Sequence, residues 1–352
     1  MELFRHPSFD NHEAVLFASE AESGLQSIIA IHNTSRGPAL GGCRYWQYAT
    51  EDEALKDVLR LARGMTYKAA IAELPLGGGK TVILADPERR KDPGLFRALG
   101  RKIEMLGGRY ITAEDVGTSP ADMVEVRKET RYVAGIPPEQ GGRGDPSPIT
   151  AYGVYLGLCE TVRHALKRDN LRGLTVAVQG LGHVGFNLCR HLNQAGAQLI
   201  VADLNAERIR RAEEAFGARP VGLVEILTVE ADVLSPNALG AVLNAETIPR
   251  LKVAAIAGAA NNQLADIERD GALLVRRSIA YAPDYVINAG GLTVVCGEYL
   301  GWTADEISRR VDAIGPRLAD ILREASARGE PTQVVADRKA ERLFAASHGS
   351  RV

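Results

Sequence analysis

The feature that most constrains the fold is a glycine-rich turn between an apolar run and an amphipathic helix pattern. The turn, Gly180-Leu181-Gly182-His183-Val184-Gly185, follows the apolar run 174–179. The helix pattern runs to Gly196, and a second apolar run, 197–203, ends on Asp203. A strand, a helix and a strand in this order predict a crossover unit of a parallel sheet. The unpaired N–H groups at the start of the helix then lie at the glycine turn.

The second half of the chain continues this alternation, which predicts an α/β, doubly wound domain of the Rossmann type. The further elements that we expect are a helix over 206–217, strands in the apolar runs 253–257 and 279–287, a helix from the capping box Thr303-x-x-Glu306 to about Arg328, and a last helix that begins at Pro331 and folds back on the first domain.

The glycine turn and the acidic residue after it predict a dinucleotide-binding site. Asp203 lies 18 residues beyond Gly185, where a carboxylate can accept hydrogen bonds from ribose hydroxyls. It repels the extra phosphate of NADP, and its neighbours Leu204 and Asn205 carry no guanidinium, so NAD is favoured. The His183 imidazole is expected to face solvent. The predicted cofactor-binding residues of this segment are Gly180, Gly182, His183, Val184, Gly185 and Asp203.

The length of the chain predicts two α/β domains with a cleft between them. A chain of 352 residues exceeds what one hydrophobic core usually organises. Glycine and proline concentrate between about residues 135 and 148, which marks a boundary. We expect a catalytic, substrate-binding and oligomerisation domain over 1–140 plus the C-terminal helix 330–352, and an NAD-binding domain over 141–329.

Composition excludes several classes of partner. The net charge of -2 provides no field that would attract nucleic acid or an anionic membrane. Four cysteines without a Cys-x-x-Cys pair indicate buried thiols, with neither a metal site nor a disulfide framework. The first residues carry charges and a proline where a signal peptide needs an apolar run, so the cytoplasm is the expected compartment.

The first half combines apolar strands with glycine-rich segments. Residues 27–32 predict a buried strand, and 37–42 predict a turn or close-packed loop. The capping box Thr50-x-x-Glu53 predicts a helix that runs towards Lys68. The segment 76–81 contains a glycine triplet, for which we expect a tight turn or a close approach to a ligand, opening onto a strand at 82–85.

Two lysines and one aspartate in this half are candidate substrate-binding or catalytic residues. Lys68 and Lys80 lie in apolar or glycine-rich segments, and Asp115 follows the apolar run 110–113. A lysine in such surroundings is costly unless it meets an anion, and two lysines near each other depress the pKa of one of them. An amine of that kind can act as a base near neutral pH. The motif Gly79-Lys80-Thr81 imitates a phosphate-binding loop, but the glycine that such a loop needs is Leu74 here.

Six motifs in order along nearly the whole chain resemble the leucine, valine and phenylalanine dehydrogenases of the Glu/Leu/Phe/Val dehydrogenase family, and the leucine-type members most of all. Each motif alone is modest evidence, whereas the ordered set is specific. The motifs are Gly37-Pro38-Ala39-Leu40-Gly41-Gly42, Gly64-Met65-Thr66-Tyr67-Lys68, Gly77-Gly78-Gly79-Lys80, Thr112-Ala113-Glu114-Asp115-Val116-Gly117, Ala260-Asn261-Asn262-Gln263-Leu264 and the run 282–291.

The resemblance implies NAD-dependent oxidative deamination of an apolar L-amino acid to a 2-oxo acid and ammonia. Lys68 is then expected to bind the substrate carboxylate, Lys80 to activate the water that attacks the imine, and Asp115 to exchange protons with the amino group. Asn262 and Asn288 resemble positions that place substrate and nicotinamide, and Thr150 resembles one near the cofactor. The family also implies a homo-oligomer of unstated size.

The resemblance further implies an apolar pocket for the substrate side chain, which favours leucine, valine or isoleucine over glutamate. Ala113 is typical of leucine-type members, whereas Leu292 is more like the phenylalanine type, so phenylalanine or tryptophan is the alternative. The segment 295–298 departs from the family pattern and puts the local helix in doubt. A non-catalytic NAD-binding regulator is the alternative of another class. The predicted pocket residues are Leu40, Gly41, Ala113, Leu292 and Val295.

Overall fold

The computed structural model describes residues 2–89 and 91–346, which form two compact units. The first unit contains residues 1–144, 294–303 and 340–352, and the second contains 145–293 and 304–339. The chain therefore passes between the units four times. Each unit has a sheet and a hydrophobic core of its own.

The first unit is built on a mixed sheet of five strands in the order β1-β2-β4-β3-β5. β1 and β4 pair antiparallel to β2, whereas β3 pairs parallel to both β4 and β5. Parallel pairing of the last three strands places their carboxyl ends at one edge of the sheet. The strands are β1 (Ala14–Glu20), β2 (Leu25–Asn33), β3 (Ala39–Trp46), β4 (Gly77–Leu84) and β5 (Tyr110–Glu114).

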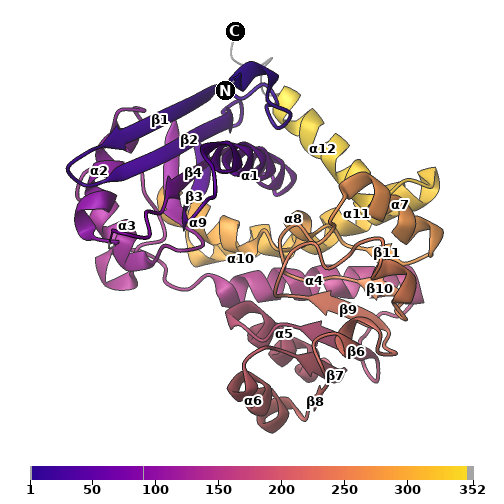
Figure 1. Cartoon of the computed structure of the whole chain (residues 1–352). Coiled ribbons are helices and arrows are strands. Elements are labelled where there is room, and N and C mark those ends of the chain that lie inside the picture. The colour runs from indigo at the N-terminus through magenta and orange to yellow at the C-terminus, as the bar shows by residue number, and fades with distance from the viewer. Residues whose placement is uncertain (1, 90, 347–352) are drawn as a thin grey trace. The chain divides into compact units, whose positions relative to one another are not determined.

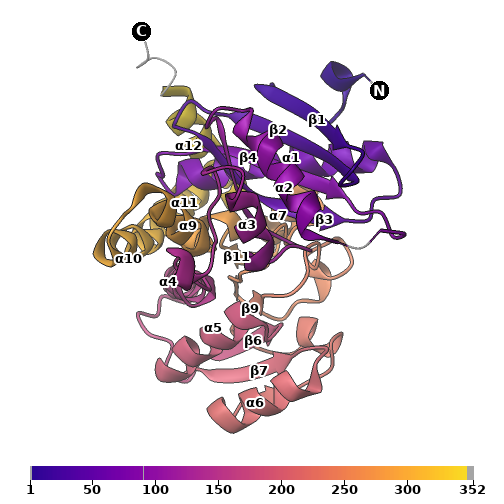
Figure 2. The same cartoon turned by 90° about the vertical axis from the view of Figure 1, so that its left-hand side faces the viewer.

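Helices cover both faces of this sheet (Figures 1 and 2). α1 (Glu51–Ile71) packs Leu55, Val58 and Leu59 on one face, against residues such as Val82 of β4. On the other face Phe96 of α2 (Pro93–Glu104) and Met123 of α3 (Pro120–Arg127) join the larger core around Tyr110. Thr50 caps α1 by accepting the N–H of Glu53, as its capping box predicts. Short 3-10 helices lie at Leu3–Arg5 and Pro138–Gln140.

The second unit contains a parallel sheet in the order β11-β10-β9-β6-β7-β8. The sheet grows outward in both directions from the central pair β6 and β9, which is the doubly wound order predicted from the sequence. The strands are β6 (Thr175–Gln179), β7 (Gln198–Ala202), β8 (Arg219–Pro220), β9 (Val233–Pro236), β10 (Ala255–Ile256) and β11 (Ala280–Tyr281).

In the second unit α5 packs on β6 and β7, and α4 packs on β10 and β11 (Figure 1). The long α4 packs against α5 and α11. The helices are α4 (Ser147–Leu166), α5 (His183–Gln194), α6 (Ala206–Phe216), α7 (Ile267–Arg276), α8 (Asp284–Ile287), α9 (Gly290–Leu300), α10 (Ala304–Asp312), α11 (Ile314–Arg328) and α12 (Thr332–Ala346), with 3-10 turns at Glu225–Leu227 and Ile248–Arg250.

The predictions of a turn or close-packed loop at 37–42 and of a tight turn at 77–79 were wrong for most of these residues, because they lie in strands. Residues 39–42 lie in β3, and the triplet Gly77–Gly79 lies inside β4 together with Lys80. The glycines serve close packing inside the protein. A Cβ on Gly78 would lie 2.0 Å from the backbone nitrogen of Thr66 in α1. A helix can therefore lie directly on the strand.

Some predictions for the second half also differ from the structure. The run 279–287 is the short β11 followed by α8, and the helix predicted to run to Arg328 is two helices, α10 and α11. Pro316 lacks the N–H that a continuous helix would need there. Helix α4 and strand β9 were not predicted.

The two units differ in their limits from the predicted ranges 1–140, 141–329 and 330–352. The first division falls at Gly144 and Asp145, and the end of the chain changes unit only after Lys339, within α12. Residues 294–303 belong to the first unit, although sequence neighbours on both sides belong to the second. A segment this short leaves no signal in the composition, because most of its residues, 294–300, form part of the continuous helix α9.

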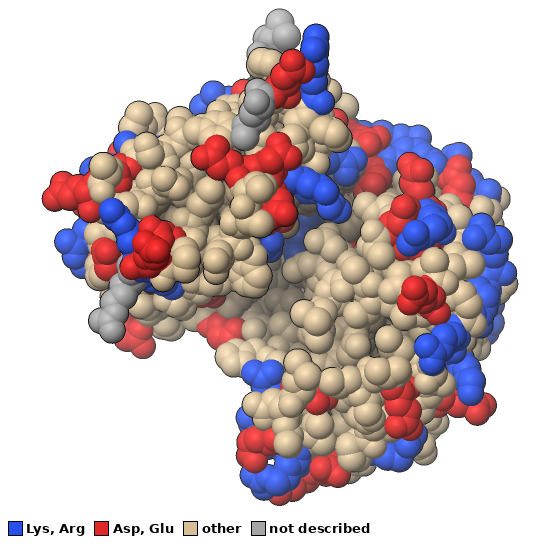
Figure 3. Space-filling model, viewed as in Figure 1, with Lys and Arg blue, Asp and Glu red and all other residues tan. Residues whose placement is uncertain are grey.

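Charged side chains, candidate metal ligands and cysteines form no large cluster in the described residues. On the face drawn in Figure 3, acidic and basic side chains are interspersed. Within 2–89 and 91–346, no three His, Cys, Asp or Glu residues gather as a metal site, and no helix is long and apolar enough to cross a membrane. The four cysteines are free thiols; Cys159 is half-buried, contrary to expectation, because it lies on a partly covered face of α4.

Two glycine substitutions test the packing of α1 on β4. Gly78→Ala should destabilise the protein by about 1–3 kcal/mol, because the new methyl group meets helix backbone that cannot move away alone. Gly64→Ala is the matched control, since Gly64 is exposed in α1 and a Cβ there meets nothing within 4 Å. It should raise stability by up to about 1 kcal/mol. Thermal midpoints measure both, and equal midpoints would contradict this packing.

Candidate functional site

The glycine turn of the second unit joins β6 to α5 and leaves the start of the helix open. Gly180 has a φ of 94°, a conformation that suits glycine. A Cβ on Gly185 would lie 2.0 Å from the carbonyl oxygen of Gly180, whereas a Cβ on Gly182 would meet nothing within 4 Å. No side chain caps the first turn of α5, for which Gly182 is the N-cap. The N–H groups of this turn are therefore arranged to bind an anion.

Asp203 follows β7 and supports the glycine turn directly. Its Oδ2 accepts the N–H of Leu181 at 2.6 Å, and its Oδ1 accepts the N–H of Asn205 at 2.8 Å. Only 8% of the side chain is exposed. Arg208 lies 3.8 Å away, so a guanidinium does stand beside this carboxylate. The immediate neighbours Leu204 and Asn205 carry no guanidinium, as predicted, but the first turn of α6 brings Arg208 back towards Asp203.

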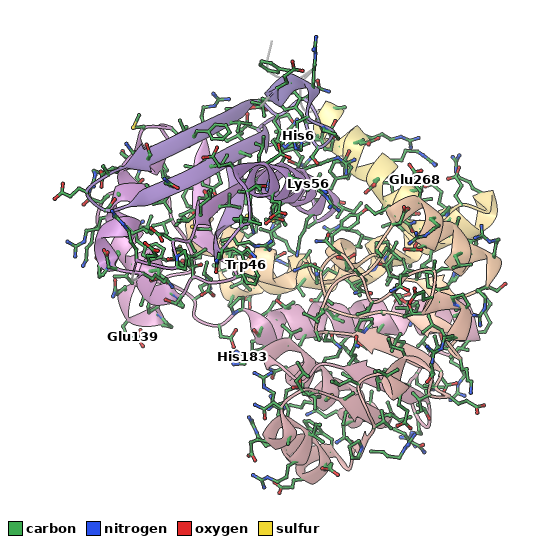
Figure 4. The ribbon with its side chains drawn as sticks, in the orientation of Figure 1. His6, Trp46, Lys56, Glu139, His183 and Glu268 are labelled. Carbon is green, nitrogen blue, oxygen red and sulfur yellow. The ribbon has the colours of Figure 1, made fainter. Side chains whose placement is uncertain are left out.

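His183 is the first residue of α5, and its side chain is 79% exposed, as predicted (Figure 4). Its Nδ1 lies 3.2 Å from the carboxylate of Asp145. Val184 follows it in the first turn of the helix and is half-buried. Neither side chain supplies a buried polar contact, so the backbone of this segment carries its potential to bind a phosphate.

Asn288 and Thr150 both belong to the second unit. The Asn288 side chain is buried, and its Nδ2 donates to the carbonyl of Ala259 and to Oδ1 of Asn261, at 3.0 and 2.8 Å. Its Oδ1 is buried without a hydrogen-bond partner in the described chain. Thr150 lies in the first turn of α4, where its Oγ1 is 2.7 Å from the position of a Cβ on Gly291. The unsatisfied Asn288 oxygen is an acceptor available to a ligand.

Asp284, which lies in the motif run 282–291, supports the backbone of Asn262, and the sequence did not predict this role. Its Oδ2 accepts the N–H of Asn262 at 2.8 Å, and its Oδ1 accepts the Tyr281 hydroxyl at 3.2 Å. Asn262 has a φ of 53°, in the left-handed region. Asp284 therefore stabilises the unusual backbone of a predicted substrate- and cofactor-binding residue. The pairing joins residues 22 positions apart, which sequence spacing alone does not reveal.

In the first unit Lys80 and Asp115 form a largely buried ion pair. Lys80 is in the central strand β4, and Asp115 follows β5. The Lys80 Nζ lies 2.9 Å from Asp115 Oδ2, and the two side chains are 6% and 23% exposed. Because strand side chains alternate, Lys80 faces the α1 side together with Gly78 and Val82. The structure thus brings together the two residues predicted to be catalytic.

Arg44 of β3 is the second cation on Asp115, and the sequence analysis did not identify it. Its Nε lies 3.1 Å from Asp115 Oδ2. Burial alone would raise the pKa of Asp115, but Lys80 and Arg44 more than offset that effect and hold the pKa below its ordinary value. The carboxyl group is therefore ionised at neutral pH. An arginine in an otherwise apolar and glycine-rich strand was the available signal.

The other predicted residues of the first unit are placed by α1, β3 and β5. Lys68 is half-buried in the last turn of α1. Leu40 and Ala113 are buried, and Gly41 lies on β3 opposite Thr112 of β5. A Cβ on Gly41 would lie 1.7 Å from the carbonyl oxygen of Gly79, so strand packing by itself requires glycine there.

Leu292 and Val295 both lie on α9, three residues apart. The segment 295–298 continues this helix to Leu300, so its departure from the family pattern leaves the helix intact. Glu298 accepts N–H groups from Gly135 at 2.8 Å and from Arg143 at 3.1 Å. This carboxylate ties the glycine- and proline-rich segment before Asp145 to α9.

Comparison with known proteins identifies the family. Residues 12–132 match the Glu/Leu/Phe/Val dehydrogenase, dimerisation domain, and residues 201–341 match the Glutamate/Leucine/Phenylalanine/Valine dehydrogenase domain. The chain belongs to the Glu/Leu/Phe/Val dehydrogenase family. It is therefore an amino-acid dehydrogenase, an oxidoreductase that acts on CH–NH2 donors, and not a non-catalytic regulator.

The similarity extends over nearly the whole chain. The leucine dehydrogenase of Geobacillus stearothermophilus is 52% identical over 341 residues, 97% of this chain and 93% of its own. The L-tryptophan dehydrogenase of Nostoc punctiforme is 45% identical over 330 residues, 94% of this chain and 92% of its own. A crystal structure of L-tryptophan dehydrogenase from Nostoc punctiforme superimposes with a TM-score of 0.85 at 43% identity, covering 97% of this chain and 98% of that one.

The ionised state of Asp115 predicts a pH-dependent contribution to stability. A carboxyl group whose pKa is depressed on folding stabilises the protein above its unfolded pKa, about 4, and loses that contribution as pH falls through the folded value. Asp115→Asn should therefore lower the thermal midpoint at pH 7, and the deficit should shrink as the pH approaches 3. A deficit that stayed constant from pH 7 to pH 3 would show that Asp115 is not held ionised.

Proposed function

We propose that this chain catalyses the reversible oxidative deamination of leucine, valine or isoleucine to the 2-oxo acid and ammonia with NAD. The buried Lys80–Asp115 pair is the observation that carries the proposal. Burying an ammonium group in a central strand is costly and has no packing advantage over an apolar side chain. The family supplies a chemistry that uses an amine and a carboxylate together.

The residues of the first unit are assigned the handling of the substrate. Lys68 binds the α-carboxylate, and Asp115 takes a proton from the α-amino group. A nicotinamide held by the second unit would supply the acceptor for the Cα hydride, and the substrate carbon would then be an iminium carbon. Lys80 then activates the water that adds to this carbon and stabilises the developing oxygen, and Asp115 returns a proton to the departing ammonia. One amino acid, one NAD and one water give one 2-oxo acid, one ammonium, one NADH and one proton.

The residues of the second unit fit a dinucleotide. The uncapped N-terminus of α5 offers N–H groups to the pyrophosphate, and the open space over Gly182 admits it. Asp203 is assigned the ribose hydroxyls. Thr150, Asn262 and Asn288 are assigned the nicotinamide end, where the unpartnered Asn288 oxygen can accept a hydrogen bond.

The substrate side chain is assigned to the apolar residues Leu40, Gly41, Ala113, Leu292 and Val295. A charged side chain would lose its hydration there without gaining a partner. Leucine dehydrogenases at 49–52% identity favour an aliphatic substrate, whereas the tryptophan and phenylalanine enzymes at 44–45% make an aromatic one the alternative. We also propose a homo-oligomer, in line with the dimerisation domain that residues 12–132 match.

Substrate choice is tested by NADH formation from a panel of L-amino acids. The kcat/KM values should be highest for leucine, valine and isoleucine, lower for phenylalanine and tryptophan, and negligible for glutamate. Because one methylene in an apolar pocket discriminates by only about 1–3 kcal/mol, differences within the aliphatic set should stay below about 200-fold. A clear preference for an aromatic substrate would establish the alternative.

The assigned proton chemistry is tested by Lys80→Met and Asp115→Asn. Each should lower kcat by at least about 10²-fold, because each removes an acid or base that acts on the reacting atoms. NAD binding, measured by calorimetry, should remain within a few-fold of the unsubstituted protein. Turnover near the original rate in either variant would refute the assignment.

Cofactor choice is tested at Asp203 and Arg208. The unsubstituted protein should prefer NAD to NADP, and Asp203→Ser should narrow the ratio of the two kcat/KM values by removing the charge that repels the extra phosphate. Because Arg208 stands 3.8 Å from this carboxylate, Arg208→Gln in the Asp203→Ser background should restore part of the preference. An unchanged ratio in Asp203→Ser would exclude this residue as the selector.

A further inference from the structure

Arg44 joins two carboxylates on the α1 side of the first sheet, and the reaction assigned above gives it no role. It lies near the end of β3, two residues before the exposed Trp46 (Figure 4). Its Nε lies 3.1 Å from Asp115 Oδ2, and its Nη1 lies 2.9 Å from Asp57 Oδ2. The Arg44 side chain is 23% exposed, so both contacts are largely shielded from bulk water. A planar guanidinium that uses two different edges in this way fixes the direction of both carboxylates.

The two cations on Asp115 use the same oxygen atom. Lys80 lies 2.9 Å from Oδ2 and Arg44 lies 3.1 Å from it. Within the described part of the chain, Oδ1 receives no hydrogen bond. A carboxylate whose one oxygen is held by two cations cannot rotate freely. Its second oxygen is then left in a defined direction to exchange a proton.

Arg44 is itself held from the opposite side. Asp57 belongs to α1, and its Oδ2 also accepts the Tyr48 hydroxyl at 2.6 Å. Lys80, Arg44, Asp57 and Asp115 together carry no net charge, which lowers the cost of burying the group. Asp57 and Tyr48 thus leave the guanidinium little freedom to move away from Asp115.

We propose that Arg44 is a positioning residue for the deamination: held by Asp57 and Tyr48, it fixes Asp115 so that Oδ1 faces the substrate amino group and is ionised when the substrate arrives. The proposal rests on the proposed function. Arg44 exchanges no proton itself, because a guanidinium stays charged throughout the working pH range.

The charges around Asp115 make the proposal testable through pH. Burial raises the pKa of the Cys43 thiol and of the Tyr110 phenol, so both stay neutral at the pH of an assay. The acidic limb of kcat/KM then reports Asp115 in the field of its charged neighbours. The groups that face it are Lys80 of β4, Arg44 of β3, Asp57 of α1 and the neutral Cys43 and Tyr110.

The deciding experiment compares the pH profiles of Arg44→Gln and Asp57→Asn. Arg44→Gln removes a positive charge beside Asp115, so the acidic limb should move to higher pH, and kcat/KM at neutral pH should fall by about 10²-fold as the carboxylate loses its orientation. Asp57→Asn removes a negative charge, so its acidic limb should move to lower pH with a smaller loss of rate. A merely structural role would lower the thermal midpoint or the rate of both variants without moving the limbs in opposite directions.

Three further samples complete the test. Arg44→Lys keeps the positive charge but lacks the planar guanidinium, so its acidic limb should return towards that of the unsubstituted protein while only part of kcat is recovered.

Arg210→Gln is the matched control, because Arg210 bridges Glu207 and Glu214 on the exposed α6, and it should leave the pH profile unchanged. The unsubstituted protein distinguishes failure of the proposed deamination from failure of the Arg44 role, because an unsubstituted protein that oxidises no amino acid refutes the proposed function. An active protein whose acidic limb is unmoved in Arg44→Gln, or moves the same way in Asp57→Asn, overturns the role of Arg44 alone.

Discussion

The first unit is organised around an ammonium group that has been placed inside a sheet. Lys80 is 6% exposed in a central strand, and it needs an anion there because an unpaired charge in such surroundings would be strongly destabilising. Asp115, which directly follows strand β5 of the same sheet, supplies the anion. The glycines of β3 and β4 allow close packing around it: a side chain at Gly41 would collide with the backbone of β4, and one at Gly78 would collide with the backbone of α1.

The second unit uses glycine for a different purpose, which is to expose backbone N–H groups. Gly180 adopts a positive φ, and Gly185 lets the helix pass close to the carbonyl of Gly180. Asp203 then accepts the N–H of Leu181, so the carboxylate that is assigned the ribose also holds the turn in shape. In the proposed function, one acidic residue therefore couples the shape of the glycine turn to the recognition of the ribose.

The sequence predicted the elements whose residues form a local pattern of apolar spacing and turn residues. The strand, glycine turn and helix around residues 174–194, and the doubly wound order of the second sheet, follow from periodicity and turn residues. The triplet Gly77–Gly79 was misread, because a glycine run has the same local signature in a loop and in a tightly packed strand.

The residues that were missed act through pairings between distant segments. Arg44 meets Asp115 across 71 positions, and Asp284 meets Asn262 across 22. Their partners are set by strand register and helix packing, which a single sequence does not specify. Lys80 and Asp115 were found from their apolar and glycine-rich surroundings, and the ordered motifs along the chain then gave each of them a role.

The central claim is that the buried amine and carboxylate of the first unit deaminate an amino acid. The most direct measurement follows NADH and free ammonium together while the purified protein oxidises L-leucine. The expected result is one ammonium for each NADH, and neither product from Lys80→Met although that variant still binds NAD. A folded protein that binds NAD and yields neither product from any apolar amino acid, or yields NADH without ammonium, would contradict it.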